Sequence, residues 1–237
     1  MIVLLFFTIS VQSQLFSGKV TYNATLLRSQ NQFNLDTIKS SMRAKKLMKD
    51  LFKNGNKINY VLTFNNNKSL FQKKKELQIR KNILLEARLG KGSFYYNRKN
   101  HNLIYKRETY GEPFLISYPK TEWKITQETK KINGYLCGKA ITTIVENSRA
   151  KRTSTIIAWF AFDLPYNFGP NQFVGLPGLV LELNYIGKYK LKAIKIELNS
   201  KNKIKIELPK KGKKISLEKY EKQLEEMFVK RRIRGQN

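Results

Sequence analysis

The sequence predicts a mainly β protein, with a single curled antiparallel sheet or half-barrel of about ten strands, one internal helix and a C-terminal helix. Three observations predict it. Short runs that alternate apolar and polar residues recur along the chain, turn residues separate them closely, and helical periodicity is clear in only two places. A chain of 237 residues is long enough to bury a core and forms one domain, or two at most.

The first third of the chain contains a strand, a helix and a hairpin. Lys19 to Leu26 alternates with the period of a half-buried strand. From Asp36 to Phe52 the apolar residues fall near one face of a helix whose other face is rich in lysine, and Asn54-Gly55 ends it. Alternation then resumes in two runs that a triple-asparagine turn joins, Ile58 to Phe64 and Ser69 to Phe71.

The middle of the chain opens with charge and continues with strands. Gln72 to Lys91 carries clustered charge with little period, which is typical of a mobile loop or a weak helix. The strands expected after it are Ser93 to Asn97, Leu103 to Thr109, Phe114 to Tyr118, Trp123 to Thr129, Lys139 to Val145, Arg152 to Phe160, Leu179 to Tyr185, Tyr189 to Leu198 and Lys203 to Leu208.

The C-terminal region is a basic linker followed by a helix. Pro209 to Lys214 breaks the strand pattern, and Ser216 is placed to cap a helix with Glu218 in its first turn. Leu217, Tyr220 and Leu224 lie on one face of this helix. We expect that face to dock on the sheet, with a partner-binding role as the alternative.

The first 13 residues carry no charge and are mostly apolar, and Val11 to Ser13 supplies small residues for cleavage before Gln14. This pattern predicts a signal peptide, and therefore an exported protein, periplasmic or secreted and soluble. No later run reaches the length of about 20 apolar residues that a membrane-spanning helix needs. The expected organisation is 1–13 signal peptide, 14–208 β domain, and 209–237 basic linker and helix.

The densest motif couples glycine and proline, since Gly175-Leu176-Pro177-Gly178-Leu179 must turn tightly and then enter a strand. Further residues extend the pattern on the N-terminal side: Trp123, Gly134, Tyr135, Cys137, Trp159, Pro165, Gly169 and Pro170. Together they resemble the signature of the GLPGLI family of exported bacterial proteins, with Val180 where the family name has isoleucine. The resemblance implies an exported β domain and leaves its activity open.

Two interpretations of this motif stay open at the level of sequence. In the structural one, which we favour, Gly175 and Gly178 supply positive φ and close backbone approach while Phe173 and Leu176 pack over a sheet edge. In the other, the loop contacts a ligand above an aromatic floor that includes Trp159.

The formal net charge of +29 indicates attraction to anionic partners. Lysine supplies 35 of the 46 basic residues, and the charges are spread along the whole chain. A sequence-specific DNA reader more often uses arginine and a recognition helix, so the composition argues against that class. A non-specific anionic polymer or an anionic lipid headgroup remains a possible partner.

Catalytic chemistry has few candidate residues. His101 is the only histidine and Cys137 the only cysteine, so neither a histidine-based triad nor a zinc site is expected, and no cofactor is predicted. We expect His101 in a surface turn and Cys137 buried and reduced. A pair of catalytic carboxylates would have to come from Glu122, Glu128, Glu146, Asp163 and Glu182. The spacing favours none of them, and Glu182 is expected to point outward and to pair with a lysine.

These observations predict an exported envelope protein that is not an enzyme and acts as a binding or interaction module. Two alternatives stay open. The concave face of the sheet could hold a lipid or another apolar ligand, as a periplasmic carrier does. The basic surface could instead make an adhesive module for acidic polysaccharide, nucleic acid or anionic lipid.

Overall fold

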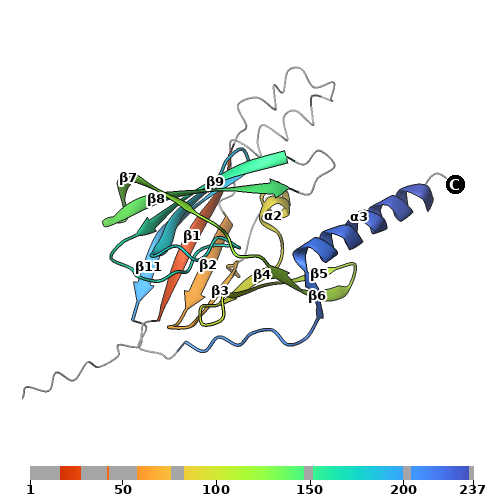
Figure 1. Cartoon of the computed structure of the whole chain (residues 1–237), viewed down its shortest axis with the longest axis horizontal. Helices are drawn as coiled ribbons and strands as arrows, with labels where there is room; N and C mark the ends of the chain where they lie inside the picture. The colour runs from red at the N-terminus through yellow and green to blue at the C-terminus, as the bar shows by residue number, and fades with distance from the viewer. Residues whose placement is uncertain are drawn as a thin grey trace, which may run out of the picture.

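The computed structural model describes residues 17–27, 42, 58–75, 83–146, 152–199 and 204–234. Twelve strands form one sheet (Figure 1). They are β1 Gly18–Leu26, β2 Ile58–Phe64, β3 Lys68–Lys73, β4 Ser93–Asn97, β5 Asn102–Thr109, β6 Glu112–Tyr118, β7 Lys124–Ile132, β8 Tyr135–Glu146, β9 Arg152–Ala161, β10 Leu179–Tyr185, β11 Tyr189–Leu198 and β12 Lys213–Ser216.

The strand order is β12-β6-β5-β4-β3-β2-β1-β11-β10-β9-β8-β7. Every neighbouring pair is antiparallel except β12 and β6, which run parallel. β7 and β12 are the two edges. The predicted mainly β fold with a curled sheet is confirmed, and β12 is an addition that lies inside the predicted basic linker.

The sheet curls strongly, and the connection between β6 and β7 demonstrates it. Nine strands lie between these two in the sheet, so in a flat sheet they would stand about 50 Å apart. Residues 119–123 join them directly. A chain of that length reaches only about 20 Å, so the two wings of the sheet must face one another. Figure 1 shows β4–β6 and β7–β9 on opposite sides of the central strands.

Two helices accompany the sheet within the described residues. α2 Ile83–Leu89 lies in the charged segment, where a loop or a weak helix was predicted. The predicted helix from Asp36 to Phe52 falls outside the described residues, apart from Met42. α3 Leu217–Arg234 is the predicted C-terminal helix, and the Lys219 amide donates to Ser216 Oγ at 3.3 Å, as expected of the cap.

α3 contacts the sheet through its first turns and then projects away from it (Figure 1). Its buried residue is Tyr220, whose ring meets Phe114 of β6 at 5.3 Å and whose hydroxyl lies 2.8 Å from Thr109 Oγ1. Docking on the sheet is therefore confirmed for the start of the helix. Further along, Met227 and Val229 are exposed.

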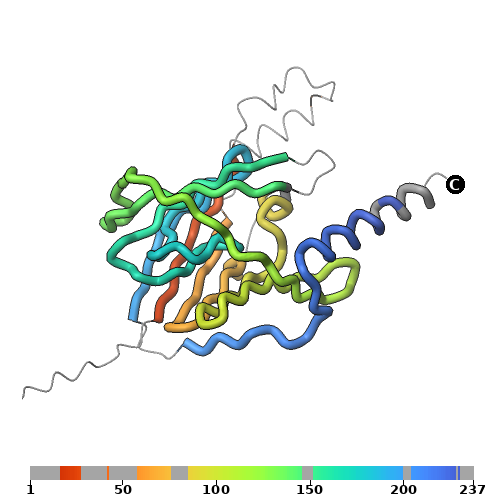
Figure 2. Tube along the Cα trace, in the orientation of Figure 1, coloured from red at the N-terminus to blue at the C-terminus, as the bar shows by residue number. Residues whose placement is uncertain are grey.

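The strand predicted from Lys203 to Leu208 is wrong in the part that the structure describes. Residues 204–212 run as an irregular strap from the end of β11 towards β12, a path that Figure 2 follows. Ile206 of the strap is buried, and Asn65 Nδ2 donates to the Ile204 carbonyl at 3.0 Å. The strap therefore holds the lower ends of the central strands without joining the sheet.

No helix in the described ranges is long and apolar enough to cross a membrane. The predicted signal peptide, residues 1–13, lies outside those ranges.

Candidate functional site

The interior of the curled sheet is filled by residues 162–178, which we call the inner loop. Six of its large side chains are buried: Leu164, Tyr166, Phe168, Phe173, Val174 and Leu176. Phe168 contacts Phe64 of β2 at 5.5 Å and Tyr96 of β4 at 6.1 Å between ring centroids, while Phe173 meets Tyr185 of β10 at 6.3 Å. The loop thus packs against both halves of the sheet, β2 and β4 in one half and β10 in the other, and occupies the concave face.

Trp123 fixes the inner loop to the β6–β7 connection. Its ring contacts Phe173 at 6.1 Å, and its Nε1 donates to the Val174 carbonyl at 3.0 Å. Thr121 Oγ1 donates to the neighbouring Gln172 carbonyl at 3.3 Å. The fold therefore brings Trp123 together with the motif residues that lie in the inner loop, from Pro165 to Gly178.

The glycines of the motif have different roles from each other. Gly175 has φ 92° and an open surrounding, so it supplies the positive φ that the sequence predicted. Positive φ at Gly178 was also expected and is wrong. A Cβ at Gly178 would lie 2.0 Å from the Ala161 carbonyl oxygen, and one at Gly169 would lie 2.0 Å from the Phe173 carbonyl oxygen. Close backbone approach therefore requires these two glycines.

A small cavity, which we call the mouth pocket, opens where the inner loop meets the β4–β5 turn and the β6–β7 connection. Its volume is about 40 Å³, and it is lined by Tyr96, His101, Leu103, Pro119, Lys120, Thr121, Val174 and Gly175. The predicted surface position of His101 in a turn is confirmed, with φ 52°. Its imidazole Nδ1 lies 3.2 Å from the Tyr96 hydroxyl.

The polar side chains that line the mouth pocket are those of Tyr96, His101 and Thr121, together with the ammonium group of Lys120. Burial raises the pKa of Tyr96, against the opposing charge of Arg98, so its phenol stays protonated at neutral pH and can donate. Lys120 is exposed at the rim, whereas Leu103 and Val174 are buried in the wall. The pocket therefore combines an apolar wall with hydrogen-bonding groups.

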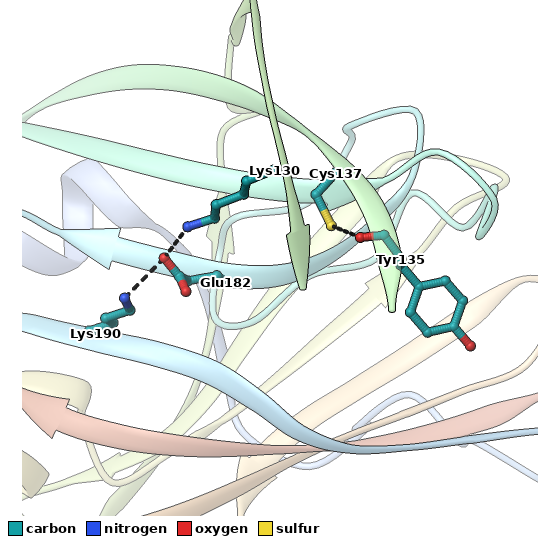
Figure 3. Close-up of polar contacts among 5 residues, drawn as sticks. All are labelled: Lys130, Tyr135, Cys137, Glu182 and Lys190. Carbon is teal, nitrogen blue, oxygen red and sulfur yellow. Dashed lines mark hydrogen bonds and ion pairs between the residues drawn. The ribbon is translucent and has the colours of Figure 1, made fainter. Parts of the chain in front are cut away.

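Glu182 lies on β10, on the face of the sheet that points away from the inner loop. Among the described residues it is the one carboxylate that is buried. Figure 3 shows its carboxylate between two ammonium groups. Lys130 Nζ of β7 lies 2.8 Å and Lys190 Nζ of β11 lies 3.0 Å from Glu182 Oε1. Lys130 Nζ also stands 4.1 Å from the ring centroid of Trp159, a cation–π contact. We call these four residues the Glu182 cluster.

Opposing effects act on the Glu182 carboxyl. Burial alone would raise its pKa, but the hydrogen bonds and positive charges of Lys130 and Lys190 outweigh burial and hold the pKa below its ordinary value. The group is therefore ionised at neutral pH. Pairing with lysine was predicted and is confirmed, and the burial of the side chain, which is 5% exposed, was not foreseen.

The β7–β8 hairpin covers the Glu182 cluster, which explains the burial. Asn133 and Gly134 form its turn, both with positive φ, and Asn133 Nδ2 donates to the Ala193 carbonyl of β11 at 2.9 Å. Because β9 and β10 lie between β8 and β11, the hairpin must fold across them. Lys130 and Asn133 therefore fasten the hairpin to the sheet.

Cys137 lies beside this cluster and is fully buried, which confirms its predicted position. Its Sγ is 3.5 Å from the Tyr135 carbonyl oxygen (Figure 3). Burial raises the pKa of its thiol to about 11, so the thiol is protonated at neutral pH. A second group of motif residues thus lies at this hairpin, separate from the motif residues of the inner loop: Gly134, Tyr135, Cys137 and Trp159.

The structure describes the side chains of three of the remaining candidate carboxylates, and all three are exposed; the side chain of Glu146 lies outside the described residues. Glu122 and Asp163 are exposed, and Glu128 forms an exposed ion pair with Lys139 at 2.7 Å. Within the described ranges, no three His, Cys, Asp or Glu side chains lie close enough to hold a metal ion together.

The comparison with protein families decides what the chain is related to. A family described as N-glycanase peptide, N-terminal domain, matches residues 94–222, which is more than half of the chain. The chain belongs to this family. The match includes the inner loop, the mouth pocket and the Glu182 cluster. No curated protein matches the chain.

Two solved structures of PNGF-II are similar to the fold of this chain. In the C2 space group, PNGF-II is 20% identical with a TM-score of 0.48, over 85% of this chain and 30% of that chain. In a second crystal form the identity is 19% and the TM-score 0.52, over 89% and 33%. The second likeness shows a shared fold, and the chain spans about a third of the PNGF-II chains that it matches.

The predicted resemblance to the GLPGLI family is wrong, because the family that matches is the N-glycanase N-terminal domain. The loop itself explains the misleading motif. Gly175 needs positive φ, Gly178 must pass against the Ala161 carbonyl, and Leu176 fills the interior. In this chain the packing of the inner loop therefore accounts for the glycine and apolar residues at this spacing.

Sequence reasoning missed several residues that the fold brings together. Tyr96 and Lys120 of the mouth pocket lie in separate elements, and no local pattern connects them with His101. Lys130 was likewise not distinguished from the many other lysines. One usable signal was Asn133-Gly134, a dipeptide that favours a two-residue hairpin turn and indicates that β7 and β8 are partners.

Proposed function

We propose that this protein is a non-catalytic module that binds glycoconjugates, as a companion of N-glycanase-type enzymes and not as such an enzyme itself. Membership of the N-glycanase N-terminal domain family supports the link to glycans. The chain spans about a third of the PNGF-II chains, so the activity named for those proteins is not transferred to it.

The observation that carries the non-catalytic role is the state of Glu182. A carboxyl group that acts as general acid near neutral pH needs a raised pKa. The pKa of Glu182 is lowered, and two lysines hold one of its oxygens. Glu182 is therefore not suited to act as a general acid. By binding Lys130 of β7 and Lys190 of β11, Glu182 holds the β7–β8 hairpin against the sheet.

The filled interior weighs against the carrier alternative. The buried side chains of the inner loop stand where an acyl chain would lie. The mouth pocket, at about 40 Å³, is too small for a lipid, since pockets for drug-sized ligands are about 300–1,000 Å³. We retain the proposal of export to the cell envelope, where glycoconjugates are exposed, on the basis of the apolar residues 1–13.

The test is a comparison of two peptides of the same sequence, one with an N-linked glycan and one without. We expect the protein to bind the glycopeptide at least about tenfold more tightly, and its glycan to stay attached. Equal, strongly salt-dependent binding of both peptides would contradict the proposal and favour the adhesive basic module instead.

A further inference from the structure

The mouth pocket has the size of one small functional group. A cavity needs about 10–15 Å³ of such volume for each water molecule, so about 40 Å³ accommodates three or four non-hydrogen atoms. An isolated methyl group would leave much of that space empty, and a whole sugar ring would not fit. The ligand group therefore projects from a larger molecule that stays outside.

The lining is mixed in a way that restricts the chemistry of this group. Leu103 and Val174 are 4% and 7% exposed, and together with Pro119 they make an apolar wall. The lining also includes the paired Tyr96 hydroxyl and His101 imidazole, and the exposed Lys120. A fitting group needs an apolar end and a hydrogen-bonding end only two or three bonds apart.

We propose that the mouth pocket binds the acetamido group of an N-acetylhexosamine. The methyl group packs against Leu103 and Val174, and the carbonyl oxygen accepts a hydrogen bond from the Tyr96–His101 pair or from Lys120. The sugar ring rests outside, beside Gly175, whose surroundings are open. This inference rests on the proposed glycoconjugate-binding function and names the site and the ligand class.

An acetamido group suits this lining better than an anion does. A carboxylate or a sulfate would press an anionic oxygen against the apolar wall, where desolvation of a charge is expensive. The Tyr96–His101 pair offers hydrogen-bonding groups that match an amide. Lys120 is exposed, so its charge is largely solvated.

The first experiment compares two disaccharides that differ only in their acetamido groups. N,N′-diacetylchitobiose and cellobiose are titrated separately into the protein, and saturation transfer to the acetyl methyl protons is recorded by NMR. We expect diacetylchitobiose to bind at least about tenfold more tightly, with the strongest transfer at the methyl protons. Equal binding of cellobiose would overturn the acetamido assignment.

Two surface variants locate the site. His101→Asn removes the imidazole at a position with φ 52°, a conformation that asparagine tolerates, so folding is retained. Lys120→Met removes the ammonium group, and Lys210→Met, an exposed lysine outside the pocket, is its matched control. We expect His101→Asn to weaken diacetylchitobiose binding about threefold to tenfold, Lys120→Met to weaken it less, and the control to leave it unchanged.

Further ligands separate failure of this inference from failure of the proposed function. If the N-linked glycopeptide binds equally to the wild type and to His101→Asn, the protein binds glycans elsewhere, and the mouth-pocket assignment is wrong. If neither the glycopeptide nor diacetylchitobiose binds, both proposals are wrong. An acetyllysine peptide that competes as well as diacetylchitobiose would assign the pocket to acetylated amines in general and overturn the hexosamine.

Discussion

Gly178 allows the inner loop to pass the sheet at the closest backbone approach of the motif. Gly178→Ala places a Cβ against the Ala161 carbonyl oxygen and should destabilise the fold by about 2–4 kcal/mol. Gly175→Ala should cost about 1 kcal/mol, because its space is open and only positive φ penalises it. Pro177→Ala, at an exposed position, should cost about 0.5–1 kcal/mol.

Chemical denaturation measures all three variants under the same conditions, and the order of the midpoints is the prediction. A midpoint for Gly178→Ala that is as high as that for Gly175→Ala would contradict the close approach.

Glu182 predicts how stability responds to acid. Its pKa is lower in the folded than in the unfolded protein, so its stabilisation is complete above the unfolded value of about 4.3. The stabilisation is lost as the pH falls through the folded pKa. Glu182→Gln should therefore lower the free energy of unfolding by about 1–3 kcal/mol at pH 7 and flatten its decline in acid.

Denaturant titrations between pH 3 and pH 7 test this expectation, with Glu128→Gln as the exposed control. Identical acid profiles of Glu182→Gln and the wild type would show that the cluster does not stabilise the fold through its charge.

Cys137 provides a separate test of packing at the same hairpin. Its side chain is fully buried and burial raises the pKa of its thiol to about 11, so the reactive thiolate is scarce and shielded at neutral pH. A disulfide reagent should label the folded protein far more slowly than the denatured protein. Labelling at equal rates would place the thiol at the surface.

α3 is anchored to the sheet by its buried residue Tyr220, with Leu217 and Leu224 packed against the core beside it. Tyr220→Ala removes the ring contact with Phe114 and the Thr109 hydrogen bond, at a cost of about 3–5 kcal/mol locally. Hydrogen exchange of the α3 amides should then rise strongly while the central strands keep their protection. Lys222→Ala, at an exposed position, is the control. Unchanged exchange in α3 would mean that other contacts hold the helix.

Strand positions were predictable from sequence because alternation in a half-buried strand is local. β2, β4, β10 and β11 have the predicted bounds. β12 was not predictable, since its parallel pairing with β6 is a non-local contact made by a lysine-rich segment. The burial of Glu182 was also not predictable, because the β7–β8 hairpin that covers it crosses β9 and β10 without leaving a pattern in the sequence of β10.

For the complete fold, the sequence predicted that the sheet is curled but did not predict which residues fill its interior. Closely spaced strands predicted a curled sheet, and the fold confirms it. What fills the curl could not be predicted, because the aromatic residues of a long glycine-proline loop fit an edge cover, a ligand floor or an internal plug equally well. The contacts of Phe168 with β2 and β4 and of Phe173 with β10 show that it is a plug.

The central claim is that this protein binds glycoconjugates and leaves them intact. The most direct measurement incubates the purified protein with an N-linked glycopeptide, separates the complex, and determines the mass of the bound peptide. We expect the glycopeptide to be recovered in the complex at its original mass after prolonged incubation. Recovery of a peptide that has lost its glycan, at a rate that rises with protein concentration, would contradict it.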